Sequence, residues 1–179
     1  MALTIILDII LAILIILLVV MLWLASYINR NNRFMVPKEE KYGVDIGLKA
    51  LIIYQPSKHN TTYNMVMAAV DVFVKNGYEV TVNYPNKGVT YNMSDYDIIL
   101  FGSPVYCGAV SKSLLFYLEH FIFAKNNIGI FLTGTSEASI EDFEEIDKRI
   151  DNEKADVRKI KLGKGEEENM RKFVSEIIG

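Results

Sequence analysis

The segment 97–108 constrains the fold of this chain more than any other. Its first part, Asp97-Ile-Ile-Leu-Phe101, is a short β-branched and aromatic run, typical of a strand buried on both faces. In the part that follows, Gly102 and Gly108 permit close approach of the backbone to a ligand, and Pro104 fixes one φ angle. A core-facing helix is expected next, because apolar residues recur at helical spacing. These residues are Leu114, Leu115, Leu118, Phe121 and Ile122.

Tyr106 places a flat aromatic ring in the middle of this predicted loop. In open α/β sheets, ligands bind beyond the carboxyl ends of the strands, which is the position of this loop. We therefore expect the loop to contact a flat ligand. The alternative is a plain connection between strand and helix, because Gly and Pro mark loops of every kind.

Strand and helix patterns alternate along the rest of the chain. Strands are predicted at 48–54, 78–84, 97–101, 128–132 and 157–162, and helices at 61–75, from 114, from 139 and at 166–178. This alternation indicates parallel βαβ units with right-handed crossovers. The 78–84 strand alternates strictly between apolar and polar residues, so we expect it at an edge with one wet face. The predicted fold is an α/β, doubly wound, five-stranded parallel sheet of order 2-1-3-4-5.

The pattern Gly102-Ser-Pro-Val-Tyr106, Gly108, Ser111 and a leucine-rich helix resembles the isoalloxazine-contacting loop of the flavodoxin-like family. The resemblance is best between Lys49 and Leu132. It implies a flavodoxin-like fold that holds one FMN non-covalently where the first and third strands diverge. The residues that it implies for contact with the ring are Ser103, Pro104, Val105, Tyr106, Cys107 and Gly108.

The loop after the first strand is the candidate site for the FMN phosphate. Free N–H groups and the dipole at a helix N-terminus favour an anion there. The candidate phosphate ligands are Ser57, Lys58, His59, Asn60, Thr61 and Thr62. His59 stands where the family usually has a glycine, and positive φ would cost a non-glycine residue roughly 1 kcal/mol there. The alternative is a helix-capping turn, with Asn60 or Thr61 as the N-cap.

A third loop follows the strand that ends at Leu132, and the resemblance implies that it closes the other side of the flavin. Gly134 permits close approach, and neighbouring hydroxyl groups can donate to ring oxygens. The candidate residues are Thr133, Gly134, Thr135 and Ser136. A helix-capping turn is again the alternative.

Composition argues against several function classes. The net charge of −3 and the lack of a basic stripe argue against nucleic-acid binding. Cys107, the one cysteine, excludes a disulfide framework, and we expect an inert loop thiol. His59 and His120 are too few and too far apart for a zinc site, so no metal is expected. No nucleophile motif is present, so the redox chemistry would belong to the cofactor and no catalytic residue is expected.

The acidic run from Glu137 to Asp147 has two interpretations. Acidic residues complement the dipole at the start of a helix, so the run forms a solvated helix face in the first interpretation. In the second, which the resemblance suggests, it docks a basic redox partner beside the flavin.

Residues 1–28 form the predicted membrane anchor. Ile9 to Ile28, mostly Leu, Ile and Val, is long enough as a helix to cross a hydrocarbon core roughly 30 Å thick. A cleaved signal peptide is the alternative, but no basic segment precedes the apolar run and the run exceeds an ordinary h-region. Basic residues follow instead, in a polar tether at 29–46, and the positive-inside tendency places the domain at 47–179 in the cytoplasm.

These features predict an FMN-binding electron-transfer protein, tethered to the cytoplasmic face of a membrane by a single N-terminal transmembrane helix. Two other functions stay open. One is an FMN-dependent oxidoreductase, namely an NAD(P)H-dependent flavin or quinone reductase. The other is a flavin-free scaffold or binding module, which the altered phosphate loop suggests.

Overall fold

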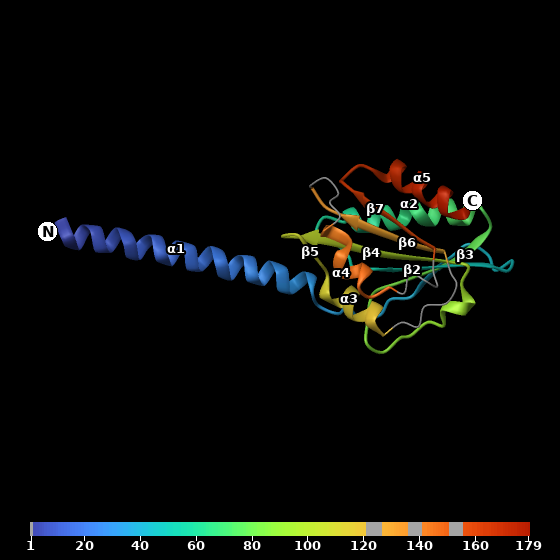
Figure 1. Ribbon diagram of the computed structural model, residues 1–179, viewed down its shortest axis with the longest axis horizontal. Helices are drawn as coiled ribbons and strands as arrows, with labels where there is room; N and C mark the ends of the chain where they lie inside the picture. Colours follow the sequence, from blue (N-terminus) through green and yellow to red (C-terminus); the bar gives the residue numbers. More distant parts are fainter. Residues whose placement is uncertain (1, 121–126, 136–140, 151–155) are drawn as a thin grey trace.

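The computed structural model describes residues 2–120, 127–135, 141–150 and 156–179 (Figure 1). One long helix projects from an α/β domain in which helices lie on both faces of a central sheet. The strands are β1 (Glu40–Tyr42), β2 (Leu48–Tyr54), β3 (Tyr78–Asn83), β4 (Ile98–Tyr106), β5 (Ala109–Val110), β6 (Asn127–Thr133) and β7 (Asp156–Leu162). The helices are α1 (Ala2–Asn31), α2 (Thr61–Lys75), α3 (Lys112–Glu119), α4 (Glu141–Asp147) and α5 (Glu167–Ile178), with a 3-10 turn, η1, at Met93–Asp95.

The sheet has the doubly wound order predicted from the sequence. Neighbouring strands follow the order β1-β3-β2-β4-β6-β7, and β5 pairs with β4 outside this path. The pairs β2–β3, β2–β4, β4–β6 and β6–β7 are all parallel. Counted among the parallel strands alone, this is the order 2-1-3-4-5, so the predicted flavodoxin-like winding is confirmed.

Both faces of the sheet are buried because its central strands are apolar at nearly every position. Ala50, Leu51, Ile52 and Ile53 of β2 are all fully buried, as expected for a parallel strand covered on two sides. Helices α2 and α5 cover one face, and α3 and α4 cover the other (Figure 1). The carboxyl ends of β2, β4, β6 and β7 therefore meet at one edge of the sheet, which we call the carboxyl edge.

The segment expected to be an irregular loop after the third predicted strand is largely a regular hairpin. β4 continues to Tyr106, the chain turns at Cys107 and Gly108, and β5 returns antiparallel to β4. The φ angles of 53° at Cys107 and 73° at Gly108 are those of a tight hairpin turn. Gly102 lies within β4, where an added Cβ would stand 2.1 Å from Cζ of Phe131. Gly102 therefore makes room for this ring and is not among the residues that line the cavity at this edge.

Part of the predicted tether is folded against the domain. β1 pairs antiparallel with β3, so the prediction of an exposed edge at 78–84 is wrong. Thr81 and Asn83, expected on a wet face, are buried. The Lys38 N–H donates to Asn83 Oδ1 at 2.9 Å, which fixes the approach to β1.

Charged groups also hold β1 in place. Lys38 and Glu40 form an ion pair at 2.5 Å, and the Tyr42 hydroxyl donates to the Glu40 carboxylate at 2.7 Å. The hydrogen bonds from Lys38 and Tyr42 lower the pKa of Glu40, and the bond to Glu40 raises the pKa of Tyr42 to about 12. Tyr42 is therefore a neutral donor at physiological pH.

Helix α1 is long and apolar. From Thr4 to Ser26 its 23 residues have a mean hydropathy of 3.5, and none of that window is buried in the protein. By length and composition alone, such a helix fits a membrane span or an N-terminal signal sequence.

Candidate functional site

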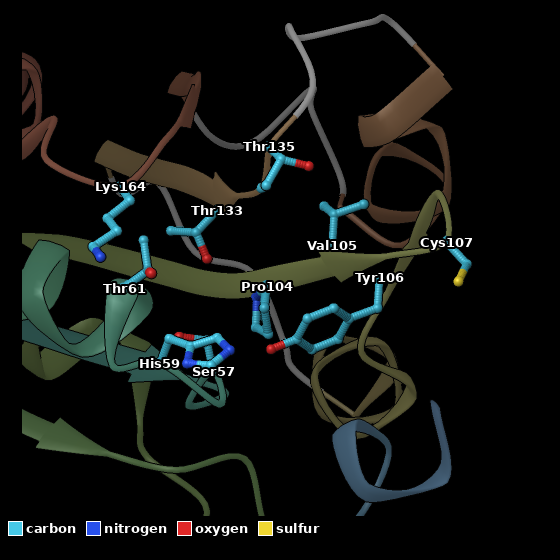
Figure 2. Close-up of a pocket in the computed structure, with 11 residues that line it drawn as sticks. Ser57, His59, Thr61, Pro104, Val105, Tyr106, Cys107, Thr133, Thr135 and Lys164 are labelled. Carbon is cyan, nitrogen blue, oxygen red and sulfur yellow. The ribbon is translucent and has the colours of Figure 1, made fainter. Parts of the chain in front are cut away.

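A cavity of about 350 Å³ lies at the carboxyl edge, where β2, β4 and β6 end (Figure 2). Small-molecule sites typically have volumes of roughly 300–1,000 Å³. The residues that line the cavity are Ser57, His59, Thr61, Pro104, Val105, Tyr106, Cys107, Thr133, Gly134, Thr135 and Lys164. The three segments singled out in the sequence therefore come together around one cavity.

The loop between β2 and α2 brings polar groups to one end of the cavity. The N-cap residue Asn60 makes no capping bond with its side chain. Instead, Ser57 Oγ accepts a hydrogen bond from the Thr62 N–H at 3.1 Å. Thr61 begins α2 and lines the cavity (Figure 2). The N–H groups and dipole of this helix end favour an anion here.

The backbone strain expected at His59 lies one residue later. Asn60 has φ 59° and ψ 8°, the left-handed conformation, whereas His59 is not among the described residues with positive φ. Asparagine adopts this conformation more readily than most residues. The predicted penalty at His59 is therefore wrong, and the loop already has a suitable residue where one is required.

Tyr106 forms a flat wall along the other part of the cavity. Its ring extends from the hairpin toward the first loop, where the Lys58 N–H donates to its hydroxyl oxygen at 3.0 Å (Figure 2). Pro104 and Val105 make this end of the cavity apolar. An aromatic ring beside apolar side chains provides a surface on which a flat ring system can stack.

Residues of the third predicted loop form the opposite wall. Thr133 ends β6, and its hydroxyl lies 2.7 Å from that of Thr62 in the interior, which joins β6 to α2. Thr135 lies further along, toward the hairpin end (Figure 2). An added Cβ at Gly134 would stand 3.2 Å from Lys161 Cε. Gly134 therefore leaves space for the lysine that packs behind it.

A buried ion pair lies beside this wall. Lys161 Nζ is 2.7 Å from the Asp142 carboxylate, and the two side chains are only 2% and 9% exposed. Asp142 belongs to the acidic run interpreted as a solvated face, so that interpretation is wrong for this residue. Glu137, at the start of the run, lies outside the described residues. Removing one partner of a buried pair typically costs about 3–5 kcal/mol, so the pair is expected to hold α4 against β7.

Lys164 is the cavity-lining residue that the sequence analysis missed. It lies in the turn between β7 and α5, and its side chain points toward Thr61 and Thr133 (Figure 2). It brings a cation to the polar end of the cavity. A sequence signal was available, since the Gly163-Lys-Gly165 turn follows a predicted strand and so falls at the carboxyl edge.

Some predicted site residues do not line the cavity. Ser103 is fully buried; its hydroxyl donates to the Pro104 carbonyl at 2.9 Å and accepts from the Ser111 N–H at 3.1 Å. It therefore fixes the base of the hairpin. Lys58, Asn60, Thr62 and Gly108 belong to the surrounding segments without lining the cavity, and Ser136 lies outside the described residues.

Solved structures of flavodoxins share this fold. Flavodoxin 2 from Bacillus cereus is similar with a TM-score of 0.59 at 20% identity, over 73% of this chain and 97% of its own. The flavodoxin of Streptococcus pneumonia TIGR4 has a TM-score of 0.58 at 17% identity, and the match covers 73% of this chain and 97% of that flavodoxin. Rubredoxin oxygen:oxidoreductase from Desulfovibrio gigas gives 0.57 at 18% identity, over 72% of this chain and 35% of its own. No protein-family model and no curated protein matches the sequence.

The chain therefore has the flavodoxin-like fold, as the residues of the β4–β5 region first indicated. At these identities the likeness defines the fold. The function is argued from the cavity and its residues, because one fold supports many functions.

Proposed function

We propose that this protein binds one FMN in the carboxyl-edge cavity and transfers electrons at the cytoplasmic face of a membrane, to which α1 tethers it. The observation that carries the proposal is the division of the cavity into a polar, cationic end and an apolar, aromatic end. FMN has the same division, with a phosphate at one end and a flat ring system at the other. When bound, FMN supplies the redox chemistry, and the protein binds and orients it.

The polar end suits a phosphate. Ser57 and Thr61 carry hydroxyl groups, Lys164 carries a positive charge, and the N-terminus of α2 adds its dipole. His59 lies beside them. A phosphate recognised by a charged donor forms stronger hydrogen bonds than one recognised by neutral donors alone.

The aromatic end suits the isoalloxazine ring. Tyr106 supplies one wall, and Thr133 and Thr135 lie across the cavity from it (Figure 2); Gly134, between them in the chain, also lines the cavity. A flat ring between these walls would contact the tyrosine on one side and the Thr135 hydroxyl on the other. Cys107 lies at the tip of the hairpin and is exposed.

The membrane tether is inferred from α1 and from the charges that follow it. The apolar window from Thr4 to Ser26 is followed by Arg30, Arg33, Lys38 and Lys41. This arrangement favours a cytoplasmic domain by the positive-inside tendency. A reporter fused after Gly179 should be active only in its cytoplasmic form, and activity of a strictly extracytoplasmic reporter would refute this orientation.

The flavin proposal is tested with the full-length chain purified in detergent. The expected result is a yellow protein with a flavin absorption spectrum that bleaches on chemical reduction and returns with oxygen. Denaturation should release FMN, identified by chromatography against FAD and riboflavin, at about one molecule per chain. A colourless protein that cannot be reconstituted with FMN would overturn the proposal and favour a flavin-free scaffold. Rapid oxidation of NADH or NADPH with a quinone as acceptor would favour a reductase over an electron carrier.

A further inference from the structure

The junction between α1 and the domain lies at the carboxyl edge, beside the cavity. Asn32 Oδ1 accepts a hydrogen bond from the Lys112 N–H at the start of α3, at 2.9 Å. The backbone carbonyl of Arg33 accepts a hydrogen bond from Nε2 of Gln55 at 3.3 Å, and Gln55 is the residue just after β2. Figure 2 shows the last turns of α1 in blue beside the start of α3 and the hairpin. The end of the apolar helix is therefore bonded to the edge that holds the cavity.

Packing reinforces these bonds. The Phe34 ring contacts the Phe116 ring of α3 edge-on at 5.3 Å, and Lys87 Nζ lies over both rings at 5.1 and 5.3 Å. Together with the bonds of Asn32 and Arg33, these contacts hold the first residues after α1 against the domain. These contacts define the face of the domain from which its anchor leaves.

The junction is close to the end of the apolar window. The helix continues from Ser26 to Asn31, and six residues from Ser26 to Asn32 rise about 9 Å at 1.5 Å each. The headgroup layer on one side of a bilayer is about 5–8 Å thick. If α1 spans a membrane, Asn32 lies just outside the headgroups. In Figure 1, the β4–β5 hairpin projects on the side from which α1 leaves the domain, so the carboxyl edge faces that surface.

The carboxyl edge is basic. We assign to it the loops and the adjoining ends of helices and strands at 29–37, 55–60, 103–112, 133–135 and 163–165. These described segments contain no Asp or Glu. They carry the exposed cations Arg33, Lys58, Lys112 and Lys164. Glu137, which follows the segment at 133–135 in the sequence, lies outside the described residues. The edge that faces the membrane is therefore opposite in charge to an anionic leaflet.

Two described carboxylates close to these segments in the sequence accept hydrogen bonds. Glu40 is paired with Lys38 and accepts from Tyr42. Glu166 accepts hydrogen bonds from the Gly163 N–H and from Asn169 Nδ2. Lys38 offsets the charge of Glu40, whereas Glu166 keeps its negative charge two residues from Lys164, so the basic character of the edge rests on Arg33, Lys58 and Lys112.

We propose that the carboxyl edge docks on the anionic lipid surface of the membrane that holds α1, so that the cavity opens toward the lipid headgroups. The proposal rests on the membrane tether of the proposed function and is independent of the flavin. The hairpin tip, Cys107-Gly-Ala109, is exposed and uncharged, and it is the part of the edge that approaches the headgroups. A redox partner of a flavin held in the cavity would then reach it along the membrane surface, as a lipid-soluble or membrane-resident molecule does.

The chain provides its own probe for this docking, because Cys107 is its single cysteine and is exposed at the hairpin tip. The full-length protein, with a nitroxide on Cys107, is placed in nanodiscs that contain nickel-chelating lipid. One set has phosphatidylcholine alone and the other is rich in phosphatidylglycerol. We expect stronger paramagnetic relaxation of the nitroxide in the anionic discs, and loss of the difference at high salt, because the attraction is screened.

A control label position and a control charge substitution separate docking from simple proximity. A label at Ser94→Cys in a Cys107→Ser background lies on η1, before β4 begins, and should relax weakly in both lipids. Lys112→Glu should lower the ratio of docked to undocked protein about fivefold or more, since each basic residue near an anionic surface adds about 1 kcal/mol. Glutamate is tolerated at the first position of a helix. Lys75→Glu, in the last turn of α2, should leave the ratio unchanged.

Equal relaxation at Cys107 in neutral and anionic discs, or no effect of Lys112→Glu, would overturn the docking proposal. A chain that does not incorporate into the discs would overturn the membrane tether and docking together. A chain that incorporates and docks but binds no FMN would overturn only the flavin proposal. The two failures are therefore distinguishable.

Discussion

The first loop and the β4–β5 hairpin meet at the cavity, but their structures are specified in different ways. The first loop, 55–60, is irregular, and its shape depends on polar bonds such as that of Ser57 to the Thr62 N–H and on the left-handed Asn60. The hairpin is a continuation of β4, specified by strand pairing and by packing beneath it. The Lys58 N–H donates to the Tyr106 hydroxyl and so joins the two segments.

This difference assigns different roles to the two segments. Changes beneath the hairpin should act first on the stability of the fold, because they disturb a buried strand. Changes at the polar end should act on the affinity for the phosphate, because the side chains there line the cavity and add little to the core. The following predictions test this separation, in order of decreasing expected effect.

Gly102→Ala should destabilise the domain by about 3 kcal/mol, at the upper end of the usual cost of overpacking a core. Its Cβ would stand 2.1, 2.5 and 2.7 Å from three atoms of the Phe131 ring. Thermal unfolding followed by circular dichroism measures the loss. Phe131→Leu in the same chain should recover part of it, and Gly88→Ala, where an added Cβ meets nothing within 4 Å, should have little effect. Equal melting temperatures for Gly102→Ala and Gly88→Ala would refute the packing role.

Lys164→Ala should weaken FMN by roughly 1.5–3 kcal/mol, the scale of a hydrogen bond to a charged group, and leave riboflavin affinity unchanged. The reason is that Lys164 lies at the polar end with Thr61, away from the aromatic wall. Fluorescence titration of the apoprotein with each flavin gives both constants. Lys172→Ala on α5 is the matched charge control. Equal losses for the two flavins would show that Lys164 does not contact the phosphate.

Tyr106→Ala should weaken FMN and riboflavin to the same extent, because both carry the isoalloxazine ring. Aromatic pairs contribute about 0.5–1.5 kcal/mol beyond their buried area, so a loss of roughly several-fold in affinity is expected. Tyr106→Phe keeps the ring and removes the hydroxyl that accepts from the Lys58 N–H. It should therefore bind nearly as well as the wild type. Unchanged affinity and flavin spectrum in Tyr106→Ala would make this tyrosine a packing residue.

His59→Gly should change FMN affinity by less than about twofold, because the positive φ of the first loop belongs to Asn60. Asn60→Ala, by contrast, should lose roughly 1 kcal/mol of stability, since alanine is strained in the left-handed region. Asn60→Gly should be tolerated. Titration of FMN and thermal unfolding of the three variants test this assignment. An affinity gain in His59→Gly without one in Asn60→Gly would reverse it.

Much of the fold was predictable from the sequence because the central strands and helices carry strong apolar patterns. The strand at 48–54 and the helix at 61–75 were predicted with the ends that the structure shows. β1 was missed because three residues are too few for a period to emerge. The end of β4 was missed because Gly and Pro argue against a strand. Here Gly102 admits a neighbouring ring, the pairing with β6 includes Pro104, and pairing with β5 continues beyond it.

The main segments of the site were predictable, but the predicted set of residues was incomplete. Ten of its lining residues lie in the three predicted loops, because the carboxyl ends of parallel strands meet at one edge. Lys164 was missed because its turn follows the weakest strand pattern, and only the folded sheet brings it opposite Thr61. Ser103 and Thr62 were assigned to a ligand although their hydroxyl groups are used inside the protein. For Ser103 the inward direction depends on the register of strand pairing, which the sequence pattern alone does not define. Thr62 shares the buried face of α2 with Met65, Val66 and Ala69, so helical spacing already indicated its inward direction.

The most direct test of the account is the ratio of FMN to riboflavin affinity in the wild-type apoprotein, titrated at low and high salt. The two ligands share the ring and differ in the phosphate, so the ratio isolates the polar end of the cavity. We expect FMN to bind at least tenfold more tightly, about 1.4 kcal/mol, with a preference that decreases as salt screens the charge of Lys164. Equal affinities that do not respond to salt, or no binding of either flavin, would contradict the account.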